Sequence, residues 1–128
     1  MVLVDTDVLI NHLRGHAATG NWLEHARTQG PLEITVVTVA ELIGGMRSVE
    51  RQGVWRLLSA FQAVGVSELA ARRAGGFMHT HRRSHSGITL GDYLIAATTV
   101  ELGADPATMN VKHFPMFSAL RPPVPAPQ

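Results

Sequence analysis

The sequence contains no cysteine, which excludes a disulfide framework and any zinc or iron–sulfur site held by thiolates. It also contains no uncharged apolar run that approaches the roughly 20 residues a membrane-spanning helix needs. The first apolar residues, Met1–Val4, reach Asp5 too soon to form the apolar region of a signal peptide. These absences predict a protein without a membrane segment that acts in the cytoplasm.

Lysine is almost absent, since Lys112 is the only one and the other ten basic residues are arginine. The arginine guanidinium is a planar fork that suits phosphate groups. Ten acidic residues nearly balance the eleven basic ones, so the formal net charge is only +1. A net charge this small is weak evidence for a nucleic-acid partner, and the arrangement of the charges is more informative than their sum.

The chain alternates short apolar runs, typical of buried parallel strands, with segments of helical periodicity. With 128 residues, of which 45% are hydrophobic, it is long enough for one domain with a core. We expect strands at 1–4, 32–37, 64–66 and 104–109, and helices at 8–13, 17–27, from Thr38, at 48–62, 67–81 (interrupted at Gly75-Gly76) and 90–102. This order predicts an α/β fold, a three-layer sandwich with a short parallel sheet flanked by helices, over residues 1–121. Residues 122–128 hold four of the seven prolines and are expected to form a disordered tail.

Acidic residues follow the predicted strands. Asp5 and Asp7 come directly after the first strand, and Glu41 lies in the first turn of the helix after the second. Asp92 is the only charged residue between Leu90 and Val100, in a helix that is apolar on most sides. A carboxylate there needs a partner, because burying an unpaired charge costs several kcal/mol in practice. Each acid also has a structural interpretation as a helix cap, since Thr38–Glu41 and Thr89–Asp92 both have capping-box spacing.

Ligands of open parallel sheets bind beyond the carboxyl ends of the strands, which is where these acids are expected to meet. Thr108 and Asn110 follow the last predicted strand and belong to the same edge. Several carboxylates in one place repel each other unless a cation neutralises them, and no lysine is near any of them in the sequence. Oxygen-rich ligand sets select Mg²⁺ or Mn²⁺, so the pattern predicts a site for one of these ions.

Four segments of the sequence together resemble the motifs of PIN-domain nucleases. Three of them carry the acids and the fourth follows the last strand: Leu3–Ile10, Thr38–Leu42, Gly91–Ala97 and Thr108–Pro115. The resemblance covers residues 1–121 in order and spacing, and it is closest to the VapC-type toxins of bacterial type II toxin–antitoxin pairs. It implies a five-stranded parallel sheet between helices.

The resemblance also implies a function. It implies a Mg²⁺-dependent endoribonuclease toxin, with Mn²⁺ able to substitute, that cleaves structured RNA such as tRNA or rRNA by metal-activated water. A VapB-type antitoxin would inhibit it, and the chain would form a homodimer. The implied metal ligands are Asp5, Glu41 and Asp92, with Asn110 as a fourth catalytic residue where many members carry aspartate. The implied supporting residues are Thr6, Asp7 and Thr108.

The densest basic stretch of the chain lies between residues 72 and 85, where no acid occurs. Its arginines are the predicted RNA-binding residues: Arg72, Arg73, Arg82 and Arg83. The alternative interpretation of this stretch is a solvated helix face.

Two other functions remain open at this stage. One is a non-catalytic RNA- or protein-binding module with a degenerate PIN fold, which Asn110 favours and the intact acids oppose. The other is a HAD-type phosphatase, because Asp5-Thr6-Asp7 imitates the nucleophile motif of that class. That chemistry needs a well-placed lysine, for which Lys112 is the only candidate.

Overall fold

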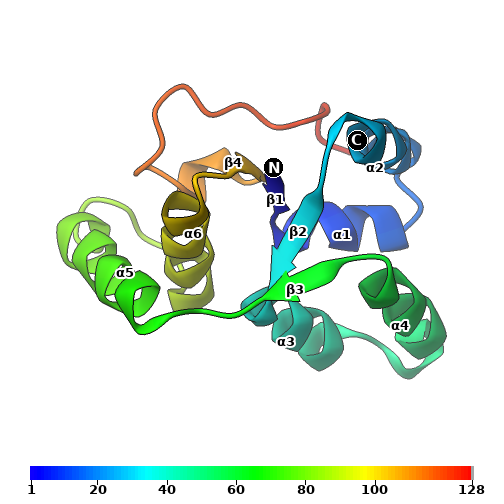
Figure 1. Ribbon diagram of the computed structural model, residues 1–128, viewed down its shortest axis with the longest axis horizontal. Helices are drawn as coiled ribbons and strands as arrows, with labels where there is room; N and C mark the ends of the chain where they lie inside the picture. Colours follow the sequence, from blue (N-terminus) through cyan, green and yellow to red (C-terminus); the bar gives the residue numbers. More distant parts are fainter. Residues whose placement is uncertain (128) are drawn as a thin grey trace.

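The computed structural model describes residues 1–127 and contains one four-stranded sheet between helices. The strands are short and all neighbouring pairs are parallel, in the order β3-β2-β1-β4 (Figure 1). Their bounds are β1 (Val2–Val4), β2 (Leu32–Thr35), β3 (Gln62–Val64) and β4 (Asp105–Ala107). The predicted α/β class and parallel sheet are therefore confirmed.

The expectation of a fifth strand is wrong for residues 1–127. After β4 the chain turns into a short 3-10 helix, η2 (Val111–His113), and then continues without a further strand. Phe114, Phe117 and Leu120 pack this segment against the core as irregular chain. Pro115 has no backbone N–H to donate to a sheet, which disfavours a strand at this point.

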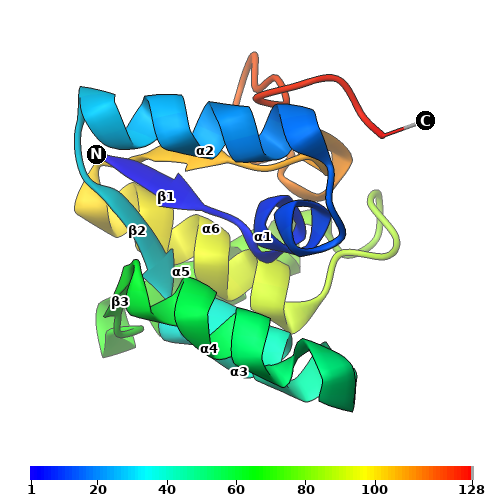
Figure 2. The ribbon, with the colours of Figure 1, turned by 90° about the vertical axis from the view of Figure 1, so that its right-hand side faces the viewer.

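Six α-helices surround the sheet. Their bounds are α1 (Thr6–Leu13), α2 (Ala17–Gln29), α3 (Val36–Gly45), α4 (Arg51–Ser59), α5 (Glu68–His81) and α6 (Leu90–Leu102), with a 3-10 turn η1 (Ser48–Glu50) before α4. Figure 1 shows α5 and α6 on one side of the sheet, with α1, α2 and α4 on the other. Figure 2 looks onto the second side, where α2 and α4 lie on either side of α1.

The two faces of the sheet form separate apolar cores, because successive strand residues point to opposite sides. Val4 and Ile34 face the first core, which they share with residues such as Val8, Leu23 and Val54. Leu3 faces the second core, with Ile95, Ala96 and Phe114. This alternation of buried residues produces the predicted three layers.

Several local predictions differ from the structure. The helix expected at 48–62 is divided into η1 and the shorter α4, and residue 62 already belongs to β3. The helix expected at 8–13 begins at Thr6, and the capping box of Thr38 and Glu41 is not formed. The cap of α3 is Thr35, whose hydroxyl accepts the amide of Thr38, so the helix begins two residues earlier than predicted. The third strand lies two residues earlier than expected, where Ile34 of β2 pairs with Ala63. Gly75 and Gly76 do not interrupt α5. Ala70 and Ala74 of α5 are buried against Tyr93 and Ala97 of α6, and this packing outweighs the helix cost of about 1 kcal/mol per glycine.

The last described residues add no regular structure. Residues 122–127 contain neither helix nor strand. Among residues 1–127, no helix is both long and apolar enough to cross a membrane.

Candidate active site

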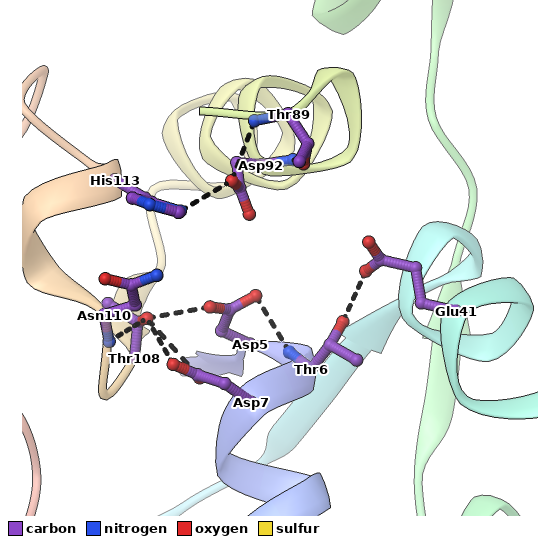
Figure 3. A network of polar contacts seen from close by, with 9 residues as sticks. All are labelled: Asp5, Thr6, Asp7, Glu41, Thr89, Asp92, Thr108, Asn110 and His113. Atoms are coloured by element: carbon purple, nitrogen blue, oxygen red, sulfur yellow. Dashed lines mark hydrogen bonds and ion pairs between the residues drawn. The ribbon is translucent and has the colours of Figure 1, made fainter. Parts of the chain in front are cut away.

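The residues that the sequence singles out converge at the carboxyl edge of the sheet. Asp5 follows β1, Thr108 follows β4, and the register Val4↔Ala107 places them side by side. Glu41 approaches from α3, and Asp92 from the first turn of α6. Figure 3 shows the side chains of Asp5, Glu41 and Asp92 around a common space.

Thr6 links two of these acids. Its backbone N–H donates to Asp5 Oδ1 at 2.8 Å, which also makes Asp5 the cap of α1 as predicted. Its hydroxyl donates to Glu41 Oε1 at 2.6 Å. The Thr38 hydroxyl lies 2.9 Å from the Thr6 hydroxyl and donates to it, since the single proton of Thr6 is directed at the carboxylate. One small residue thus orients Asp5 and Glu41 together.

Thr108 performs the corresponding task on the other side of Asp5. Its hydroxyl is fully buried, donates to Asp5 Oδ2 at 2.7 Å, and accepts the backbone N–H of Asn110 at 3.0 Å. Asp7 lies next to this pair and accepts the backbone N–H of Met109 at 3.3 Å. The Asn110 side chain is at the exposed rim of the same cluster (Figure 3).

Asp92 is held from two directions. It completes the predicted capping box of α6, because Thr89 N–H donates to Asp92 Oδ2 at 3.0 Å and Asp92 N–H donates to Thr89 Oγ1 at 3.1 Å. His113 of η2 contacts the same oxygen, with Nδ1 to Oδ2 at 3.0 Å. The partner that a carboxylate in an apolar helix requires is therefore this histidine together with the helix cap.

Gly91 explains how α3 and α6 approach each other so closely at the acids. A Cβ atom at this position would lie 2.8 Å from Glu41 Oε2 and 3.4 Å from Val37 Cγ1. Any side chain at residue 91 would therefore displace the Glu41 carboxylate. The glycine keeps Glu41 against the N-terminus of α6, beside Asp92.

The electrostatics of the site are unfavourable for its central acids. Burial raises the pKa of Asp5 well above its usual range, and the neighbouring Asp7 charge raises it further. Burial also raises the pKa of Asp7, although the Met109 N–H and other hydrogen bonds oppose this change. No arginine or lysine forms an ion pair with Asp5, Asp7, Glu41 or Asp92 within residues 1–127.

The donor set fits a hard divalent cation. It consists of carboxylate, hydroxyl and amide oxygens, which are the ligands of Mg²⁺ and Mn²⁺ in proteins. Such a cation would supply the positive charge that the buried Asp5 lacks. In residues 1–127 no three acidic or histidine side chains are drawn together tightly enough to form a closed ligand cluster. The acids thus line one edge, while Asp5 and Glu41 are tied to threonine hydroxyls.

The four predicted RNA-binding arginines are exposed but do not form one cluster. Arg82 ends α5 and Arg83 follows it, in the loop that leads to Asp92. Gly87 of this loop lies against the ring of His113, since a Cβ there would be 3.7 Å from Nε2. Arg72 and Arg73 lie ten and nine residues before Arg82, about 14–15 Å along the helix, and Arg72 pairs with Glu68 at 3.7 Å. Of the four arginines, only Arg82 and Arg83 lie in the connection between α5 and the N-terminus of α6, where Asp92 is located.

Sequence reasoning missed the contributions of Thr38, Gly91 and His113. Gly91 directly precedes Asp92, and a glycine inside the first turn of a helix is a signal for close approach of another segment. His113 lies three residues after Asn110, but nothing in the spacing indicates that its ring reaches a different helix. A groove of about 630 Å³ is lined mainly by α2 and α4 and includes none of the predicted acids.

Comparisons with known proteins agree with this geometry. Residues 2–114 match the PIN domain family. The chain is 58% identical over 127 residues to Ribonuclease VapC10 of Mycobacterium tuberculosis, which covers 99% of this chain and 96% of that protein. It is 39% identical over 124 residues to Ribonuclease VapC19 of the same organism, covering 96% of this chain and 99% of that protein.

Solved structures show the same fold. A toxin–antitoxin complex from Klebsiella pneumoniae superposes with a TM-score of 0.79 at 24% identity, covering 97% of this chain and 98% of that one. VapBC2 from Rickettsia felis, bound to a DNA fragment from its promoter, gives a TM-score of 0.76 at 21% identity, covering 92% and 94%. The family match removes the HAD-type alternative. From its sequence, its strand order and its acidic edge, the chain belongs to the PIN-domain family.

Proposed function

We propose that this chain is a Mg²⁺-dependent endoribonuclease toxin that cleaves structured RNA, such as tRNA or rRNA, and that a cognate VapB-type antitoxin inhibits it. The ribonuclease activity is supported by the near full-length similarity to two proteins named as VapC ribonucleases. The observation that carries the proposal is the acidic edge itself. Asp5, Glu41 and Asp92 are held around one space with no arginine or lysine partner among the described residues.

Asp5 and Asp92 are the proposed metal ligands, and Glu41 is a third, directly or through water. A divalent cation bound there would polarise a phosphate oxygen and lower the pKa of a water molecule. The threonines keep the carboxylates in place without neutralising them: Thr6 fixes Asp5 and Glu41, and Thr108 fixes Asp5.

The remaining residues at this edge act on the substrate and on the local charge. The Asn110 side chain, at the exposed rim, donates its amide hydrogens to a phosphate oxygen without adding charge. Asp7 adds a second carboxylate next to Asp5 and increases the negative potential that attracts the cation. Hydrolysis by water leaves a 5′-phosphate and a 3′-hydroxyl, and no residue of the chain is covalently modified.

Arg82 and Arg83 are the proposed docking residues for the RNA backbone nearest the acids, because their loop precedes Asp92 and passes near His113 at Gly87. Arg72 and Arg73 would contact phosphates further along the strand. If the four acids at the site are neutralised, six acids remain against eleven basic residues, a balance of +5 that favours a polyanion. Because Arg82 and Arg83 lie nearer the acids, replacing them by alanine should weaken RNA binding more than replacing Arg72 and Arg73.

Two further parts of the proposal concern assembly. One structural neighbour is named as a toxin–antitoxin complex and two others as VapBC assemblies, which supports a VapB-type partner for this chain. A homodimer and action in the cytoplasm, where tRNA and rRNA are found, complete the proposal.

The test is cleavage by the purified chain with and without divalent cation. Wild-type protein should cut tRNA or rRNA in Mg²⁺ and lose this activity in excess EDTA, and Asp92→Asn should be inactive while it still folds. Asp105→Asn, an exposed acid on β4, is the matched control and should cleave normally. Sequencing the new 5′-ends would identify the RNA and the bond that is cut.

The same experiment distinguishes the proposed ribonuclease from a non-catalytic binding module. A non-catalytic PIN fold would bind RNA equally well in Mg²⁺ and in EDTA and would produce no new 5′-ends. Cleavage that persists in excess EDTA would contradict the metal-dependent mechanism.

A further inference from the structure

Among residues 1–127, His113 provides the one side-chain hydrogen bond to the Asp92 carboxylate. Its Nδ1 atom lies 3.0 Å from Asp92 Oδ2, and the Thr89 N–H donates to that same oxygen at 3.0 Å. The Asp92 side chain is only 16% exposed and that of His113 is 29% exposed, so water competes little for the contact. An ionised carboxylate accepts hydrogen bonds and cannot donate them, so the histidine carries its proton on Nδ1 here.

Both contacts fall on Oδ2 and leave the second oxygen of Asp92 available. Figure 3 shows that oxygen pointing into the space between Asp5 and Glu41, on the side away from His113. A rotation of the carboxylate would break the hydrogen bonds to Thr89 and His113 together. The pair therefore fixes which oxygen faces the site and at what angle.

His113 is itself firmly positioned. It ends η2, and its own N–H donates to the carbonyl of Asn110 at 3.0 Å. The neighbouring Phe114 is fully packed in the second core. Gly87 lies near the other ring nitrogen, since a Cβ at this position would be 3.7 Å from Nε2. Gly87 adopts a φ of +86°, a conformation that favours glycine, so the residue at this position is suited to the turn beside His113.

We propose that His113 is a positioning residue that sets the metal-binding orientation of Asp92 through a hydrogen bond donated by Nδ1. The inference rests on the proposed function, in which Asp92 is a metal ligand. Residues that hydrogen-bond a metal ligand typically change metal affinity by about 10- to 100-fold when they are removed. His113 thereby connects η2, which also carries Asn110 at its start, to the acid of α6.

The test uses two amides that differ only in where they place their nitrogen. The side-chain amide of asparagine reaches the position of Nδ1, whereas that of glutamine extends toward the position of Nε2. His113→Gln should weaken Mn²⁺ binding, measured by calorimetry on the whole chain, by about 10-fold, with a matching fall in kcat. His113→Asn should remain within about 3-fold of wild type, because the donor to Asp92 is retained.

Controls separate this role from packing and from the proposed function. His25→Gln, an exposed histidine on α2, should leave Mn²⁺ affinity unchanged. If His113→Asn and His113→Gln are equally weak, the ring only fills space and the proposal is wrong; it is also wrong if both bind Mn²⁺ like wild type. If wild-type protein binds no Mn²⁺, or if Asp92→Asn binds it normally, the proposed function fails first.

A second measurement covers the case in which the glutamine variant does not fold. In wild-type protein labelled with ¹⁵N-histidine, the Nδ1 proton of His113 should be observed as a hydrogen-bonded resonance in EDTA. It should move or disappear in Asp92→Asn. A resonance that is the same in both proteins would overturn the proposal.

Discussion

Replacing Asp5 by asparagine should increase the stability of the metal-free protein, because the buried carboxylate of Asp5 destabilises the fold. This carboxylate is only 6% exposed, faces Asp7, and is not paired with an arginine or lysine in residues 1–127. Asp5→Asn keeps the shape and keeps an oxygen for the Thr6 N–H. The amide nitrogen then donates to Thr108, whose hydroxyl turns toward Asp7, at present 3.4–3.5 Å away.

The expected gain follows from two opposing terms. An uncompensated buried charge costs several kcal/mol. The hydrogen bonds from Thr6 and Thr108 to the charged Asp5 each return about 1.5–3 kcal/mol, and the amide of asparagine keeps about 0.5–1.5 kcal/mol of each, so the substitution loses only about 1–1.5 kcal/mol per bond. We expect Asp5→Asn to stabilise the metal-free protein by about 1–3 kcal/mol at pH 7.5, which raises Tm by about 5–10 °C for a domain of this size.

The pH dependence of this gain has a defined sign. The pKa of Asp5 is raised in the folded protein, so the unfolded chain ionises first as the pH rises. Below about pH 4 both states are protonated and the charge contributes no cost. As the pH rises from there through the folded-state pKa, wild-type stability falls, and the advantage of Asp5→Asn grows to its full size.

The assay is thermal unfolding of wild type, Asp5→Asn and the control Asp105→Asn in EDTA between pH 4 and pH 8, repeated with Mg²⁺. Added Mg²⁺ should stabilise wild type and the control but not Asp5→Asn, because a ligand stabilises only the state that binds it. A variant that is less stable than wild type in EDTA at pH 7.5, or an advantage that does not change with pH, would refute this reasoning.

Three more outcomes are expected. Gly91→Ala should lower cleavage at least 10-fold with no loss of Tm, because its methyl group displaces Glu41 while alanine favours the helix by up to about 1 kcal/mol; normal activity would contradict the close contact. Replacing Arg82 and Arg83 by alanine should raise the RNA Kd and flatten its dependence on log salt by about 0.7 per lost contact on a single strand, with Mg²⁺ affinity unchanged. Asn110→Asp should tighten Mg²⁺ binding in calorimetry by adding a charge beside the other acids, and weaker binding would argue against a position near the cation.

The sequence was sufficient for the order of the elements and for the acidic edge, because both depend on local patterns. Short apolar runs that end in Asp5 or Thr108 identify the strands and the edge they share, and Thr89 with Asp92 identifies the start of α6. The cap of α3 was predicted wrongly because Thr35 and Thr38 both suit the position. Pairing of β2 with β1 and β3 decides between them by ending the strand at Thr35.

The individual hydrogen bonds between side chains of distant segments could not be predicted from the sequence. His113 meets Asp92 across 21 residues, and the separation between Thr6 and Glu41 is 35. No periodicity encodes such pairs, since they depend on how η2 and α3 are packed against the sheet. The separation of the four arginines into two pairs was not predicted either. Because α5 continues through Gly75 and Gly76, Arg72 and Arg82 lie near opposite ends of the helix.

The choice of threonine rather than lysine around the acids is consistent with a site made for a cation. A lysine beside Asp5 would neutralise the carboxylate, lower its pKa and compete with any metal ion. The Thr6 N–H and the Thr108 hydroxyl orient the two Asp5 oxygens and leave the negative charge uncompensated. A cation bound at the proposed site would recover the resulting cost in folding stability, which would link stability and ion affinity through the same carboxylates. Within residues 1–127, the missing arginine or lysine partner and the raised pKa of Asp5 thus have one physical consequence for the proposed site: its edge would be fully stable only with a bound cation.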